Sequence, residues 1–155
     1  MTTCLLDVNV LVALMWPAHE AHATAQAWFR RIPGRKWATC PLTQAGFVRI
    51  VSNPSFSPQA VSPRQAIDVL AANVGHSGHV FWPDDLTVPE ALSVFGPKLT
   101  GHGQITDAYL LGLAVHKKGL LVTFDRAILT LAVRDMVSNN SVELIGDKLK
   151  HVPRV

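Results

Sequence analysis

The sequence predicts an α/β fold of three layers, in which a mostly parallel central sheet lies between helices on both faces. Short apolar runs of strand length alternate along the chain with longer segments that repeat at helical spacing. The chain has 155 residues, of which 48% are apolar and 16% charged, so it can bury a hydrophobic core. No repeat or linker divides it, and we expect a single domain over residues 1–155.

The first half of the chain is predicted to begin with two strand-to-helix steps. Its first helix follows the first strand directly, and later boundaries are marked by Pro33 with Gly34, by Asn53 with Pro54, and by Ser62 with Pro63. The expected elements are a strand at 3–6, helices at 7–14 and 19–31, a strand at 37–40, and helices at 42–52 and 63–75.

The second half of the chain continues the alternation. Its clearest helix has apolar residues at positions 105, 109, 110, 113 and 114, and Gly119 ends it. The expected elements are a strand at 79–82, a short helix at 89–95, a loop at 96–103, a helix at 105–118, a strand at 120–123, a helix at 126–134 and a strand at 142–145.

Composition excludes several classes of protein. No apolar run approaches the roughly 18–20 residues needed to cross a bilayer, and the N-terminus lacks the features of a signal peptide, so we expect a cytoplasmic protein without membrane contact. Cys4 and Cys40 lie in apolar segments without metal-site spacing, and we expect them to be buried. The net charge of +3 permits an acidic partner without identifying it.

Three aspartates are predicted to meet at one edge of the sheet. Asp7 follows the first strand and Asp125 follows the strand at 120–123, and sites of open parallel sheets form beyond these carboxyl ends. Asp107 lies in the first turn of the helix that precedes the latter strand. Taken singly, Asp107 is equally typical of a helix start and Asp125 of a helix cap. Asp7 interrupts an apolar segment, where a lone carboxylate is costly.

The three carboxylates together favour a metal site. A divalent cation removes their mutual repulsion, and oxygen ligands indicate Mg²⁺ or Mn²⁺ rather than zinc. Such a metal can bind a phosphate oxygen, acidify the attacking water and stabilise the leaving oxygen. The reaction class that this predicts is phosphodiester hydrolysis.

Three acidic segments resemble the motifs of a known family. Residues 5–11, 105–110 and 121–126 look like the first, third and fourth acidic motifs of PIN-domain nucleases, most closely the VapC toxins of bacterial toxin–antitoxin pairs. The motifs occur in the family's order and approximate spacing over nearly the whole chain. The resemblance implies a PIN-like three-layer α/β/α sandwich and an endoribonuclease toxin that depends on Mg²⁺ or Mn²⁺.

The resemblance also assigns roles and partners. It implies that Asp7, Asp107 and Asp125 are catalytic metal ligands, with Asn9 and Thr123 as supporting polar groups. It further implies an RNA substrate, a cognate VapB-like antitoxin that silences the toxin, and a homodimer.

The second acid of the family is missing. It is usually a Glu in the helix after the second strand, and residues 41–49 contain no carboxylate. Gln44 or Gly46 occupies its place, and the sequence leaves the register open. A Gln can orient a metal-bound water but adds no charge. Asp84 and Asp85, beyond the third strand, could substitute, although such a pair is usually a solvated turn.

Further residues are candidates for work around the site. Arg126 adjoins Asp125 and is the best candidate for a phosphate contact, while His102 lies just ahead of Asp107 and is a candidate to face the site. Positive charge also gathers at Arg30, Arg31, Arg35 and Lys36, where solvated surface is the simpler explanation.

Two other functions stay open. A phosphohydrolase of the haloacid dehalogenase kind also places Asp after the first strand, but it needs a second Asp where this chain has Asn9. A PIN-like module that binds RNA or a protein partner without catalysis would account for the missing acid.

Overall fold

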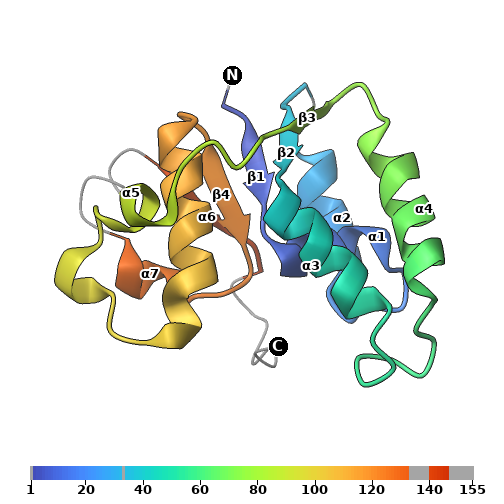
Figure 1. Cartoon of the computed structure of the whole chain (residues 1–155). Coiled ribbons are helices and arrows are strands. Elements are labelled where there is room, and N and C mark those ends of the chain that lie inside the picture. The colour runs from blue at the N-terminus through green and yellow to red at the C-terminus, as the bar shows by residue number, and fades with distance from the viewer. Residues whose placement is uncertain (1, 33, 133–139, 147–155) are drawn as a thin grey trace.

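The computed structural model describes residues 2–32, 34–132 and 140–146, and these form an α/β structure with five strands in one sheet. The strand order is β3-β2-β1-β4-β5, and every neighbouring pair is parallel. Helices α1 to α4 lie on one side of the sheet and α5 to α7 on the other (Figure 1). The predicted fold class and the parallel sheet are therefore confirmed.

The strands are short and mostly buried, as expected for a parallel sheet that is covered on both faces. Each lies within a predicted strand segment. Their bounds are Cys4–Leu6 for β1, Trp37–Thr39 for β2, His79–Phe81 for β3, Leu120–Thr123 for β4 and Val142–Leu144 for β5.

The helices follow the local signals that predicted them. Ser62 caps α4 in a reciprocal arrangement with Gln65, and Pro41 opens α3 at its first position. The helix bounds are Val8–Met15 for α1, His22–Arg30 for α2, Pro41–Val51 for α3, Pro63–Val74 for α4, Val88–Leu92 for α5, Ile105–His116 for α6 and Ile128–Leu131 for α7.

Two predicted segments needed correction. The loop predicted at 96–103 contains two short 3-10 helices, Gly96–Lys98 and His102–Gln104. The last helix begins at Ile128 rather than at residue 126, because the Asp125 carboxylate accepts a hydrogen bond from the Ala127 amide and holds these residues in a turn. The predicted end of this helix, Arg134, lies outside the described residues.

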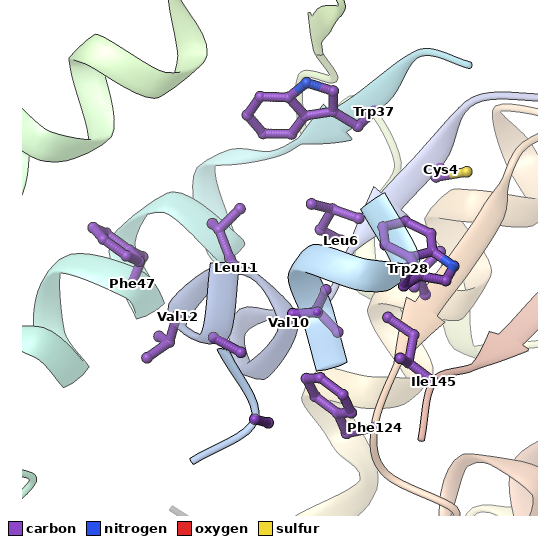
Figure 2. Close-up of a cluster of buried hydrophobic side chains, with 14 of the residues drawn as sticks. Cys4, Leu6, Val10, Leu11, Val12, Trp28, Trp37, Phe47, Phe124 and Ile145 are labelled. Carbon is purple, nitrogen blue, oxygen red and sulfur yellow. The ribbon is translucent and has the colours of Figure 1, made fainter. Parts of the chain in front are cut away.

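Side chains of successive strand residues point to opposite faces, which divides the core into two clusters. On the side of α1 to α4, a cluster contains Leu6, Trp28 and Phe47 (Figure 2). On the side of α5 to α7, a second cluster contains Leu5 and Leu121. This alternation decides on which face each residue at the end of a strand emerges.

Two expectations from composition can be compared with the structure. Cys4 and Cys40 are free thiols and fully buried, as predicted. In the described part of the chain, no helix combines the length and the apolar character needed to span a bilayer.

Candidate active site

Asp7 is the buried carboxylate at the centre of the candidate site. It directly follows β1 and caps the start of α1, and its side chain is only 6% exposed. Its Oδ1 accepts a hydrogen bond of 2.7 Å from the Val8 amide, and its Oδ2 accepts one of 2.6 Å from the Thr123 hydroxyl. The side chain is therefore fixed by the start of α1 and by the end of β4.

Alternation places the polar residues of these two strands on the same face. Leu5 and Leu121 belong to the cluster that packs against α6, so Asp7 and Thr123, each two residues further on, point to the same side. The hydrogen bond between them agrees with this placement. Asp125 lies two residues beyond Thr123, and its backbone amide donates to the Thr123 hydroxyl over 3.1 Å. Thr123 thus bridges the two aspartates.

Asp107 lies at the same edge of the sheet but comes from α6. This helix runs antiparallel to β4, which follows it, so the start of the helix lies toward the end of the strand (Figure 1). From Asp107 to His116 the helix rises about 14 Å, and the 4 residues of β4 span about 13 Å. Asp107 therefore stands level with the carboxyl end of β4.

The pKa of the Asp7 carboxyl is raised above its ordinary value. Burial is the main cause, and the negative charge of Asp125 adds to the rise, while hydrogen bonds from Thr123 and Val8 oppose it. The charge of Asp125 is therefore close enough to act on the Asp7 carboxyl. An adjacent cation would favour the charged form of Asp7.

The donor set at this edge fits a hard divalent cation in kind, because it consists of carboxylate oxygens. Asp7 and Asp125 are the two that described contacts bring together, through Thr123. Within residues 2–32, 34–132 and 140–146, however, no three His, Cys, Asp or Glu side chains are grouped closely enough to hold a metal ion. The role of Asp107 as a third ligand stays a prediction.

The two candidates for the position of the missing second acid have different surroundings in the structure. The Gln44 amide donates to the Thr39 hydroxyl over 2.9 Å, and Thr39 lies on the face of Trp37, opposite to that of Asp7. Gly46 instead packs against α1, since a Cβ added to it would lie 2.7 Å from Cγ2 of Val8. Gly46 is therefore closely packed against α1, and which of the two positions corresponds to the family's second acid stays open.

The cluster that holds Gln44 was not predicted. The Thr39 hydroxyl also forms a hydrogen bond of 2.8 Å with Nε2 of His79, and the His79 ring packs on Trp37 with 4.6 Å between centroids. Thr39 and His79 are 40 residues apart and meet because β2 pairs with β3. No local sequence signal marks this contact.

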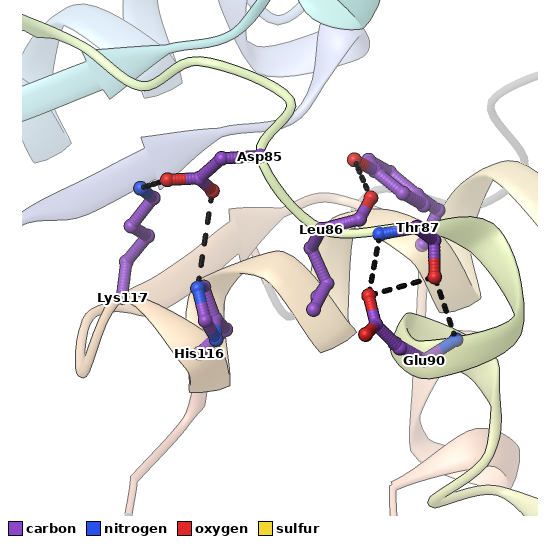
Figure 3. Close-up of polar contacts among 7 residues, drawn as sticks. Asp85, Leu86, Thr87, Glu90, His116 and Lys117 are labelled. Carbon is purple, nitrogen blue, oxygen red and sulfur yellow. Dashed lines mark hydrogen bonds and ion pairs between the residues drawn. The ribbon is translucent and has the colours of Figure 1, made fainter.

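Asp84 and Asp85 have partners away from Asp7. Asp85 forms ion pairs with Lys117 and His116 at the end of α6 that is remote from Asp107 (Figure 3). The Asp84 carboxylate accepts a hydrogen bond from the Cys40 thiol, and burial raises the pKa of the Asp84 carboxyl. Among the described residues, neither shares a contact with Asp7. The suggestion that one of them replaces the missing acid gains no support.

The remaining candidates differ in exposure. Asn9 lies in the first turn of α1 and is half-buried, while Arg126 is exposed directly after Asp125. His102 is exposed in the short 3-10 helix that precedes α6. These positions allow contact with a ligand at the aspartate edge.

The family is established by comparison with known proteins. The family model of the PIN domain matches residues 4–133 of this chain, which include all three aspartates. The chain therefore belongs to the PIN-domain family, as the acidic motifs predicted.

Curated relatives narrow the placement within this family. The chain is 46% identical to ribonuclease VapC39 of Mycobacterium tuberculosis over 137 residues, which cover 87% of this chain and 97% of the relative. It is 45% identical to ribonuclease VapC38 of the same organism, over 83% of this chain and 89% of the relative. The chain is thus a VapC-type member of the family.

Solved structures share the fold at low sequence identity. The complex VapBC2 from Rickettsia felis, bound to a DNA fragment from its promoter, contains a chain with a TM-score of 0.61 and 13% identity, covering 93% of this chain and 99% of that chain. VapC20 of Mycobacterium tuberculosis, a toxin that cleaves the sarcin-ricin loop, has a TM-score of 0.59 and 14% identity, covering 81% and 92%.

Proposed function

We propose that this chain is a metal-dependent endoribonuclease toxin whose reaction takes place at the edge formed by Asp7, Asp107 and Asp125. The observation that carries the proposal is the buried Asp7, which Thr123 fixes beside Asp125. A buried carboxylate held at this cost, with a second one next to it, is typical of a site that binds a cation.

In this proposal Asp7, Asp107 and Asp125 hold Mg²⁺ or Mn²⁺. The metal, when bound, supplies a Lewis acid for the scissile phosphate and lowers the pKa of the attacking water. Because Mg²⁺ usually keeps several waters, Asp107 can act through one of them instead of ligating directly.

The other residues prepare the site. Thr123 orients the Asp7 carboxylate and holds the Asp125 backbone in place. Arg126 contacts a phosphate of the RNA, and Asn9 and His102 contribute polar groups at the margin. No residue of α3 supplies the family's second acid, so fewer charges bind the metal and its affinity is lower.

Partners belong to the proposal as well. By analogy with the VapBC complex, a VapB-like antitoxin binds this chain. The resemblance to VapC toxins further implies that the antitoxin covers the site and that the toxin is a cytoplasmic homodimer. The approach of an antitoxin to the aspartate edge would block access of RNA.

A second candidate function follows from the acid that α3 lacks. A PIN-like module that binds RNA or a partner with little or no catalysis needs no complete metal site, and no three acids are grouped among the described residues. The two functions are separated by whether RNA is cut.

The test is cleavage of RNA by purified protein, free of antitoxin, in Mg²⁺ or Mn²⁺. We expect cleavage that EDTA abolishes and that Asp7→Asn, Asp107→Asn or Asp125→Asn reduces by about a hundredfold or more. Isothermal titration with Mn²⁺ should show weaker binding in each variant, and circular dichroism should show an unchanged fold. RNA binding without cleavage by the wild-type protein would favour the second function, and full activity in one variant would remove that aspartate from the mechanism.

A further inference from the structure

The opposite edge of the sheet carries a cluster of positive charge. Four cations lie at the end of α2 and in the turn between α2 and β2, namely Arg30, Arg31, Arg35 and Lys36, here called the basic turn. All four are exposed, and residues 30–36 contain no acid. The chain has 14 Lys and Arg, so 10 remain outside the turn against 11 Asp and Glu, a net charge of −1. The basic turn is thus a local cluster of four positive charges in a chain whose net charge is +3.

The basic turn lies at the amino ends of the strands. Lys36 directly precedes β2, and its carbonyl accepts a hydrogen bond of 2.9 Å from the amide of Cys4, the first residue of β1. Asp7 lies at the other end of β1. A strand of 3 residues spans about 10 Å, so the two edges are separated by little more than this distance.

A hollow of about 660 Å³ opens at the same edge. Among the described residues that line it, Thr2, Gly119 and Ser141 each come shortly before a strand, and Arg35 and Lys118 contribute cationic groups. Its one acid, Glu143, is engaged by the Trp28 indole, which donates to it over 2.7 Å, and by Arg35 at 3.6 Å. A hollow of this size accommodates a small organic group.

The cations of the turn are largely available to a ligand. Among the described residues, ion pairs involve Arg35 but not Arg30, Arg31 or Lys36. The ring of Phe29 is 37% exposed beside them. Cations with an exposed aromatic ring are the combination that binds a single-stranded nucleic acid, through phosphates and base stacking.

We propose that the basic turn and the adjoining hollow form a second RNA-binding surface, which holds the phosphate chain of a long substrate at the edge opposite the aspartates. The inference rests on the proposed ribonuclease function. The metal and Arg126 at the aspartate edge contact only the segment of RNA that is cut, so this edge supplies no affinity for the rest of a long RNA. The basic turn provides this affinity, and only an RNA longer than the segment at the aspartates can reach it.

The test compares long and short RNA. The variant Arg30→Gln with Lys36→Gln removes two charges from the turn, and Arg49→Gln with Arg64→Gln removes two exposed charges from α3 and α4 as a matched control. Arg35 is retained because it pairs with Glu143. Both pairs are also placed in the Asp7→Asn background, so that binding is measured without cleavage.

For the turn variant we expect about tenfold weaker binding of a transcript of roughly 100 nucleotides, and a log–log salt dependence shallower by about 1.4, two contacts at about 0.7 each. Binding of an oligonucleotide of about 8 nucleotides should change little, and kcat/KM should fall for the transcript alone. The matched control should behave as the parent does, and melting curves should show that every variant folds.

The inference is overturned if the turn variant binds the transcript as tightly as the control does. It is also overturned if the variant loses the same affinity for the transcript and for the oligonucleotide, or if it loses only binding of duplex DNA. The outcomes also separate this inference from the proposed function. Transcript binding through the turn without any cleavage would refute the ribonuclease but not the surface, whereas cleavage that is insensitive to the turn would refute the surface but not the ribonuclease.

Discussion

Asp7 and Asp85 are the same residue type in opposite surroundings. Asp7 is buried, and desolvation raises the pKa of its carboxyl. Asp85 is solvated, and its hydrogen bond with Lys117 lowers the pKa of its carboxyl (Figure 3). The Asp85 surroundings favour its charge, whereas those of Asp7 oppose it. A fold that keeps an unfavourable carboxylate in place indicates that the carboxylate has a task other than stability.

The position of the Asp7 carboxylate depends most on Thr123, whose hydroxyl donates a hydrogen bond to it. Thr123→Val should lower the affinity for Mn²⁺, and cleavage at limiting metal, by about 10- to 100-fold, the usual loss when a partner of a metal ligand is removed. Titration calorimetry and initial rates over a range of Mn²⁺ concentrations would measure it. Thr123→Ser keeps the hydroxyl and should recover most of the loss; equal losses in both variants would mean that packing, not the hydrogen bond, matters.

The close approach of α3 to Val8, the residue after Asp7, can be tested next by substitution of Gly46. Gly46→Ala should destabilise the protein by about 1–3 kcal/mol, because the new methyl group would lie 2.7 Å from Val8 Cγ2. Without this contact, Ala in a helix would stabilise by about 1 kcal/mol relative to Gly. Urea unfolding measures the change. The double variant with Val8→Ala should recover part of it, and independent effects of the two substitutions would contradict a direct clash.

The pH dependence of stability should have opposite signs for the two aspartates. With the pKa of Asp7 raised in the folded state, the folded protein retains the proton longer than the unfolded chain. Stability from this group therefore falls as pH rises from the ordinary pKa of an aspartate, 3.8, to the raised pKa. Asp7→Asn removes this fall, so in EDTA its melting temperature should exceed that of the wild type by a few degrees at pH 7 and by less near pH 4. A constant difference across this range would show that Asp7 does not titrate as proposed.

Asp85 should show the smallest effect, with the reverse sign. Its pKa is lowered in the folded state, so its contribution to stability is present above the ordinary pKa of an aspartate, 3.8, and is lost as pH falls through the folded-state pKa. Because the pair is exposed and screened by salt, Asp85→Asn should leave the melting temperature at pH 7 in 0.15 M salt almost unchanged. A drop comparable to the gain from Asp7→Asn would remove the contrast between the two sites.

Local patterns were enough to predict the order of the elements and the positions of the key acids. Strand and helix segments differ in apolar periodicity, which depends on neighbours within about one turn. Since carboxyl ends of parallel strands share an edge, Asp7 and Asp125 could be expected to meet before any coordinates were known, and Thr123 bridges them. The helix predicted to start at residue 126 was placed too early, because the Asp125 side chain forms a local turn that competes with the helix.

By itself the sequence determined the alternating elements, the acid after the first strand and the basic composition of residues 30–36, because each of these is a property of a contiguous stretch. Only the tertiary structure decided that Gln44 turns toward Thr39 and His79, that Gly46 meets α1, and that the basic turn lies beside a hollow at the amino edge. These depend on which strands become neighbours and on how closely two helices approach. Such contacts join residues far apart along the chain, and their energies come from packing that no local pattern contains.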